Sequence, residues 1–139
     1  MKEFWSLIQL IFAAVRGWID LFLGGYDGLL CALITFVVID YITGMFCAGV
    51  DHKLSSEVGF KSICQKLLIF ILVGVGNIID VQILGNSNVL RTAVIFFYLS
   101  NEGLSLLNNS ANLGLPIPHK LKDILEQLHD RAKKEDKDD

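Results

Sequence analysis

Residues 29–50, LLCALITFVVIDYITGMFCAGV, form the stretch that decides the fold. These 22 residues contain one charge, Asp40, and no proline. A helix rises about 1.5 Å per residue, so the stretch is long enough to cross the roughly 30 Å hydrocarbon core of a bilayer. A soluble protein would need a large domain to bury such a helix, and this chain has only 139 residues. The stretch therefore predicts a membrane-spanning helix.

The composition agrees with a membrane protein. Hydrophobic residues make up 53% of the chain and its mean hydropathy is +0.51, although fifteen of the last twenty residues are polar or charged. Two more apolar stretches, at about 63–84 and 89–107, are separated by the short turn Gly85-Asn86-Ser87-Asn88. Their lengths fit an antiparallel pair of spans. We expect an all-α integral membrane protein whose three transmembrane helices lie within residues 28–112.

The N-terminal region, residues 1–27, contains a further apolar segment at 4–23. Its polar positions, together with Ala13, step by four and three residues, which places them on one narrow helical face: Lys2, Ser6, Gln9, Arg16 and Asp20. Such an amphipathic helix can lie in the headgroup plane, or it can cross as a fourth span if the polar face meets protein or water. A cleaved signal peptide is a third reading, which the lack of a small-x-small cleavage site disfavours. Gly24-Gly25 and Asp27-Gly28 end this helix.

The C-terminal region, residues 113–139, changes character. Two prolines exclude regular helix from Leu113-Gly114-Leu115-Pro116-Ile117-Pro118. A short amphipathic helix follows, because one helical stripe collects its apolar residues: Leu121, Ile124, Leu125 and Leu128. The charged run DRAKKEDKDD, residues 130–139, has nothing to bury and predicts a solvated, disordered tail.

Basic residues near the spans predict the orientation. They collect between the first two spans and in the C-terminal region: Lys53, Lys61, Lys66, Lys120, Lys122 and Arg131. Cytoplasmic loops carry such an excess, so both regions and the C-terminus are expected in the cytoplasm. With three spans the N-terminus lies outside, and with four it lies inside.

Polar residues within the spans are the candidate functional residues. A charge at mid-bilayer costs about 2.5–3.5 kcal/mol on insertion scales, yet each span carries a polar face with four-three spacing. The residues on these faces are Asp40 and Thr43 in the first span, Lys66, Asn77 and Asp80 in the second, and Arg91, Tyr98, Glu102 and Ser105 in the third. Depth suggests that Asp80 lies near Arg91, and that Lys66 meets Glu102 or Asp40. These faces either join the helices to one another or line a water-filled opening.

Small residues on the spans permit close helix packing. Gly44 and Ala48 form a small-xxx-small pair in the first span, and Gly74 lies in the second. The three cysteines, Cys31, Cys47 and Cys64, form no CxxC pair and are expected to act as small apolar residues.

Enzyme chemistry finds little support in the sequence. Asp40 and Glu102 have no accompanying nucleophile, metal cluster or phosphate-binding loop. The three histidines show no metal-ligand spacing, and the basic residues form no nucleic-acid-binding stripe. We therefore expect no catalytic residues, no metal, no cofactor and no nucleic-acid partner.

The order of motifs resembles the phage-lysis and toxin-secretion holins over residues 28–128. The first half carries the segments Asp40-Tyr41-Ile42-Thr43-Gly44, Lys53-Leu54-Ser55-Ser56, Gly59-Phe60-Lys61 and Lys66. The second half is closer, with Asp80, Arg91, Tyr98-Leu99-Ser100-Asn101-Glu102, Ser105, Asn108 and residues 113–118. Ser62 departs from the pattern, where a glycine is expected.

The resemblance implies a homo-oligomer in the bacterial cytoplasmic membrane. Such proteins open lesions through which a cell-wall hydrolase (an endolysin), or in some relatives a toxin, escapes without direct contact. The free-energy cost of burying these charges would be relieved when a lesion opens, and this would make opening an abrupt, threshold event. Glu102→Gln or Arg91→Leu would then shift the timing of lysis. A small ion channel or transporter subunit, and an antiholin or membrane anchor, are the alternatives.

Overall fold

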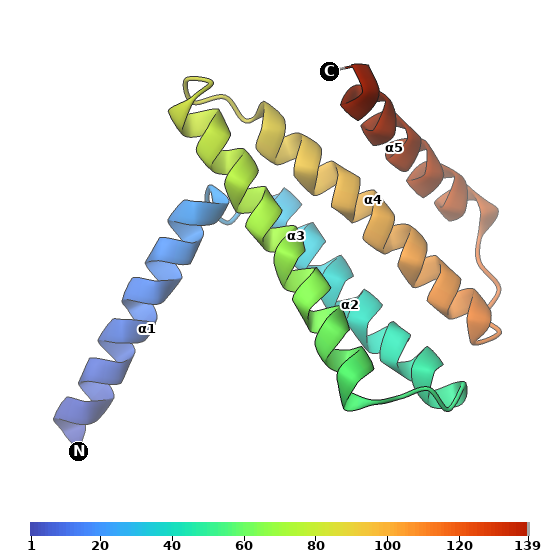
Figure 1. Ribbon diagram of the computed structural model, residues 1–139, viewed down its shortest axis with the longest axis horizontal. Helices are drawn as coiled ribbons and strands as arrows, with labels where there is room; N and C mark the ends of the chain where they lie inside the picture. Colours follow the sequence, from blue (N-terminus) through green and yellow to red (C-terminus); the bar gives the residue numbers. More distant parts are fainter. Residues whose placement is uncertain (139) are drawn as a thin grey trace.

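The computed structural model describes residues 1–138, which form five helices and, over that range, no strand. The helices are α1 (Lys2–Leu23), α2 (Gly28–Val50), α3 (Ser56–Gln82), α4 (Val89–Asn112) and α5 (His119–Asp138) (Figure 1). The predicted all-α fold is confirmed.

Local side-chain chemistry sets several helix ends. Asp27 precedes α2 and accepts a hydrogen bond from the Leu30 amide at 2.9 Å. Ser55 accepts from the Val58 amide at 3.1 Å and caps the start of α3. Such caps satisfy amides that the first helical turn leaves unpaired. Gly24 ends α1 in the left-handed conformation, with φ 85°, which a residue without a Cβ adopts at little cost.

Three helices extend beyond their predicted bounds. The α3 helix begins at Ser56, within the expected polar loop, and α4 continues to Asn112. The prediction of a disordered tail is wrong up to Asp138, because these residues continue α5. Alanine, lysine and glutamate are strong helix formers, and no glycine or proline interrupts them. Residue 139 lies outside the described part of the chain.

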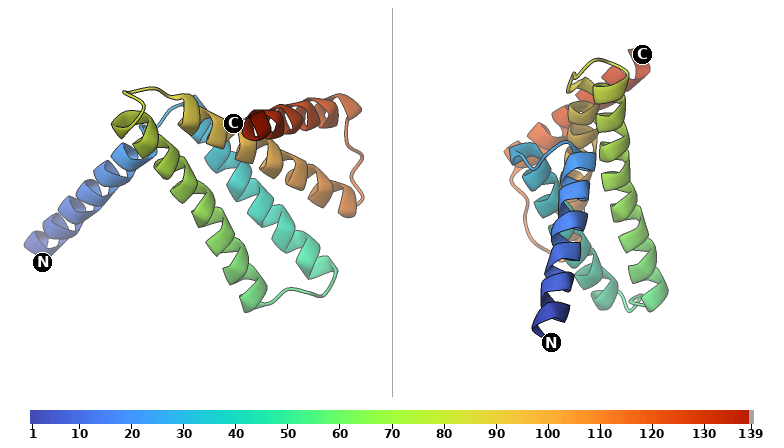
Figure 2. Two further views of the ribbon diagram at one scale, coloured as in Figure 1. Left: turned by 45° about the horizontal axis from the view of Figure 1, so that its top comes forward. Right: turned by 90° about the vertical axis from the view of Figure 1, so that its left-hand side faces the viewer.

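The α4 helix is the centre of the fold. It packs against α2, α3 and α5, whereas α2 and α3 touch each other much less. An apolar core lies where α2, α3 and α4 meet and contains Leu30, Leu33, Val37, Ile69, Val73 and Ile95. The two further views show α5 against α4 and α1 projecting from the opposite side (Figure 2). The α1 helix has no buried residue and contacts α3 near its own C-terminal end.

The distribution of side chains is that of a membrane protein. Large apolar residues face outward along α1, α2 and α3, including Phe46, Leu67 and Leu68. Charged residues lie inside, with Asp40, Asp80, Arg91 and Glu102 all at most 5% exposed. A soluble protein would reverse this arrangement. Hydrocarbon, in contrast, accepts the apolar surface and rejects the charges.

Three helices are long and apolar enough to cross a membrane: α1, α2 and α3. Two of them contain predicted spans, and the third is the N-terminal helix whose position the sequence left open. The α4 helix contains the remaining predicted span, at 89–107, and is not among the three. Its polar residues, including Arg91, Asn101 and Glu102, lower its hydropathy. Its packing between α2 and α3 nevertheless places it alongside two helices that can span.

Candidate functional site

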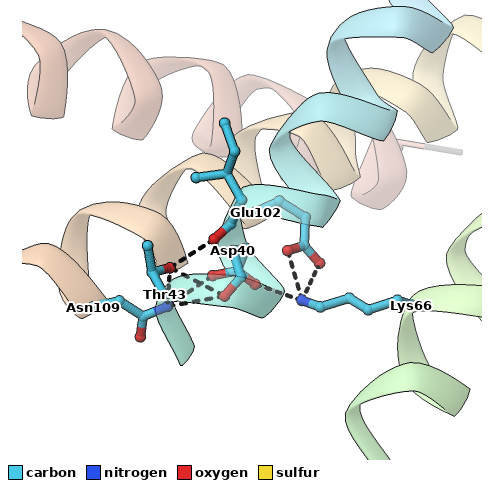
Figure 3. Close-up of polar contacts among 6 residues, drawn as sticks. Asp40, Thr43, Lys66, Glu102 and Asn109 are labelled. Carbon is cyan, nitrogen blue, oxygen red and sulfur yellow. Dashed lines mark hydrogen bonds and ion pairs between the residues drawn. The ribbon is translucent and has the colours of Figure 1, made fainter. Parts of the chain in front are cut away.

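A charge cluster joins the middle of α2, α3 and α4. Lys66 of α3 donates to Asp40 of α2 and to both carboxylate oxygens of Glu102 of α4, at 2.9 and 2.7 Å (Figure 3). The predicted approach of Lys66 to Glu102 or Asp40 is confirmed, and the lysine contacts both. The two carboxylates are 5% and 4% exposed, and the lysine side chain is 20% exposed.

Polar neighbours complete the cluster on the side away from Lys66. Asn109 of α4 donates through Nδ2 to Asp40 Oδ1 and to the Thr43 hydroxyl, both at 3.0 Å. Thr43 in turn donates to carbonyls of its own helix. Every buried side-chain nitrogen and oxygen in the described residues has a partner. This satisfaction allows charges to remain inside a small helical bundle.

A cleft of about 260 Å³ opens beside the charge cluster. Tyr98 and Ser105, two predicted site residues, line it together with the three charged groups and Gln65, Ile69 and Asn101. If Asp40, Lys66 and Glu102 are all ionised, the cluster carries one net negative charge. The cleft therefore has an acidic, hydrogen-bonding wall within an otherwise apolar bundle.

A second cluster holds the corner between α1 and α2. The Arg91 guanidinium donates to the carbonyls of Leu23 and Gly25, at 2.6 and 2.9 Å, and to Asp27 at 2.8 Å. Asn77 donates to the carbonyls of Leu21 and Phe22. These carbonyls lie at the end of α1, where no further helical turn supplies amides. The hydrogen bond from Arg91 holds the pKa of Asp27 below its usual range, so this carboxylate is ionised at neutral pH.

Asp80 joins α3 to α4 in a different way from the predicted pairing with Arg91. Its carboxylate accepts from the Leu90 and Arg91 amides, at 3.0 and 2.8 Å, and from the Ser87 hydroxyl. Asp80 thus caps the first turn of α4, where a negative charge is favourable. The expected proximity of Asp80 and Arg91 is confirmed through the Arg91 amide, whereas the Arg91 side chain turns to Asp27.

Two of the three predicted packing residues, Gly44 and Gly74, lie at helix contacts. A Cβ on Gly74 would collide with the ring of Phe22, so the glycine makes room for the last turn of α1. A Cβ on Gly44 would lie 3.7 Å from Asn109 Nδ2, an ordinary contact across α2 and α4. Ala48, one turn later, is half-buried. The free cysteines are half-buried as well.

The sequence placed Asn109 on the polar face of the third span, but neither Asn109 nor Asp27 was singled out as a site residue. Asn109 continues the four-three spacing of the α4 face, which was a signal that it belongs with Glu102 and Ser105. Asp27 was interpreted only as part of a helix break. An aspartate directly before a long apolar run is also a typical N-cap, and a capping carboxylate can bind a cation as well.

The predicted polar residues have different structural roles in different parts of the bundle. The charge cluster links three helices in the middle of the bundle, whereas Asn77, Asp80 and Arg91 organise helix ends. No group of three or more His, Cys, Asp or Glu side chains in the described residues is placed to hold a metal ion. The arrangement can hold helices together through charge, and it can present those charges to water if the helices separate.

Comparison with known proteins places this architecture in a family. A family model for the bacteriophage holin family matches residues 17–130. A probable holin of Bacillus phage phi105 is 38% identical over 103 residues, covering 73% of this chain and 76% of the phage protein. An uncharacterised protein of Listeria innocua is 42% identical over 131 residues, covering 91% of each chain. A 14.9 kDa protein of Clostridium perfringens is 35% identical, covering 91% of this chain and 92% of its own length.

No solved structure matches the chain. The family match extends over most of the sequence, and it includes the charge cluster, the corner cluster and most of α5. The chain belongs to the bacteriophage holin family.

Proposed function

We propose that the protein is a holin that assembles with copies of itself in the bacterial cytoplasmic membrane and opens lesions there. A cell-wall hydrolase, or in some relatives a toxin, then crosses the membrane through these lesions. The observation that carries the proposal is the charge cluster, which is buried inside a bundle whose outer surface is apolar. Helices of this kind are stable in hydrocarbon only while the charged faces meet one another.

Separation of the helices would convert the same faces into the wall of an aqueous opening. Asp40, Lys66 and Glu102 come from three different helices, so any opening between those helices exposes them together. Water would then solvate the charges, and this solvation offsets part of the cost of separating the bundle. Enzyme chemistry has no place in this mechanism.

We place α1 to α4 across the membrane and α5 on the cytoplasmic side. Four spans set the N-terminus, the α2–α3 loop and the α4–α5 loop on one side, where the basic residues Lys53, Lys61 and Lys120 lie. An excess of lysine favours the cytoplasmic side for the two loop regions, and four spans then place the N-terminus on the same side. Labelling single cysteines near Lys2 and in the 85–88 turn, in intact cells of a cysteine-free variant, tests this topology. Only the turn should react from outside.

Induction of the gene alone in a bacterium tests the function. A holin gives abrupt, non-selective entry of a membrane-impermeant dye after a delay, together with loss of viability. Selective conductance without death would instead support a channel or transporter subunit. A chain that reaches the membrane fraction and never leaks would support an antiholin or a membrane anchor.

A further inference from the structure

The α5 helix covers one side of α4. Leu125 is 8% exposed and packs against Gly103, where an added Cβ would come within 3.0 Å of the leucine. One turn away, His129 lies against Phe97, with ring centroids 5.6 Å apart, and its Nδ1 is 3.5 Å from the Ser100 hydroxyl. We call Phe97, Ser100 and Gly103 the covered face of α4. Both Ser100 and Gly103 are buried.

The position that α4 would take in a bilayer is difficult to reconcile with the packing of α5 against it. The α4 helix packs along α2 and α3, which can both span a membrane, and the charge cluster joins all three. If α2 and α3 cross the bilayer, α4 therefore lies at the same depth. Because α5 runs back along α4, it would then lie at that depth as well (Figure 1).

The α5 helix is too polar to remain there. Lys120, Lys122, Asp123 and Glu126 are all exposed, and in the bilayer they would meet lipid. One buried leucine and a histidine contact do not offset the transfer of several charges into hydrocarbon. At the membrane surface, in contrast, the stripe of Leu121, Ile124, Leu125 and Leu128 can enter the headgroup boundary while the charges stay in water.

We propose that α5 is a removable cover, and that the covered face of α4, once exposed, binds the same face of a second copy of this chain. The proposal rests on the holin function proposed above and names the surface through which copies assemble. Glycine and serine allow two helices to approach closely. The Ser100 hydroxyl donates to the Phe97 carbonyl at 2.8 Å, so it needs no partner from the second copy. The face carries no charge, since Arg91 and Glu102 point to other helices, and two like faces do not repel each other.

Cross-linking in membranes tests the surface. In a variant with the three native cysteines replaced, Ser100→Cys should form chain-to-chain dimers with a short thiol cross-linker. Asn108→Cys, on an exposed side of the same helix, is the matched control and should form at least fivefold fewer dimers. Dimers at Asn108 but not at Ser100, or at neither because lipid covers the face, would overturn the proposal.

A reversible cross-link between α4 and α5 tests whether α5 must leave α4 before the protein can act. The pair Ser100→Cys and His129→Cys, joined within one chain by a short disulfide-forming cross-linker, should hold α5 on α4. The locked protein should not admit dye, and a reducing agent should restore dye entry to the level of the unlocked double variant. Equal dye entry with fully cross-linked and uncross-linked protein would overturn the role of α5 as a removable cover, while the holin function would still stand. If the unlocked protein never leaks, the holin function fails, and the dimers at Ser100 still decide whether the face pairs.

Discussion

At the scale of single residues, Lys66 is central to the stability of the bundle. It is the cation shared by Asp40 and Glu102, which are both almost completely buried. Removing one member of a buried ion pair leaves an uncompensated charge, and this is far more costly than removing all members together.

We expect Lys66→Met to lower the free energy of unfolding in detergent micelles by about 3–5 kcal/mol, because two buried carboxylates lose their partner. The measurement is titration with a denaturing detergent, followed by circular dichroism. Lys61→Met, at an exposed position on the same helix, is the control and should change stability by less than about 0.5 kcal/mol.

Combining Lys66→Met with Asp40→Asn and Glu102→Gln should recover most of the lost stability, because no buried charge remains. A triple variant that is less stable than Lys66→Met alone would show that the hydrogen bonds of the carboxylates, and not the charge imbalance, determine the effect.

Glu102→Gln should delay the onset of dye entry by an induced culture. The substitution leaves Lys66 paired with Asp40 and removes one of the two buried carboxyl groups, so less burial of ionisable groups is relieved when the helices separate. Glu57→Gln, at an exposed position in the first turn of α3, should leave the onset unchanged. Earlier or unaltered onset in Glu102→Gln, at equal amounts in the membrane, contradicts the proposed role of charge burial.

At the scale of elements, the position of α1 depends on the corner between α1 and α2. Its last turn is held by Arg91, Asn77 and the space above Gly74, while the rest of the helix is exposed. The sequence showed a glycine in the second span but not the ring that occupies the space beside it. It also placed Arg91 near Asp80 at the turn between α3 and α4, but it did not show that the arginine side chain binds Asp27.

Gly74→Ala should loosen this corner, because the added methyl overlaps the Phe22 ring. Overpacking of this kind costs about 1–3 kcal/mol. Amide hydrogen exchange of residues 21–27 in micelles should become faster, and adding Gly74→Ala to Phe22→Ala should produce little further change. Gly49→Ala, with open space around it, is the control. Fully additive effects of the two substitutions would show that the ring and the glycine do not compete for the same space.

The polar periodicity of the helices shows how far sequence reasoning reaches. Four-three spacing identified the inward faces of α2, α3 and α4, since hydrocarbon rejects those side chains, and it brought Lys66 to its partners. An amphipathic stripe reveals which side of a helix is apolar, but not what covers that side. The packing of α5 on α4, through Leu125 and Gly103, was therefore not predicted.

At the scale of the whole molecule, the bundle is inverted relative to a soluble protein. Apolar residues cover its outer surface and charges lie in its interior, which suits a lipid environment and is the basis of the proposed opening to water. The α1 and α5 helices lie at opposite sides of this bundle (Figure 2). One projects into the surroundings, and the other covers the central helix.

Release of a cell-wall hydrolase tests this view of the molecule most directly. The chain and a cytoplasmic hydrolase without a secretion signal are induced together in a bacterium, and culture density is followed over time. We expect a constant density, then an abrupt fall with release of a large cytoplasmic enzyme, and no fall when the hydrolase is induced alone. A culture that keeps its density while the chain accumulates in the cytoplasmic membrane would contradict the proposed function.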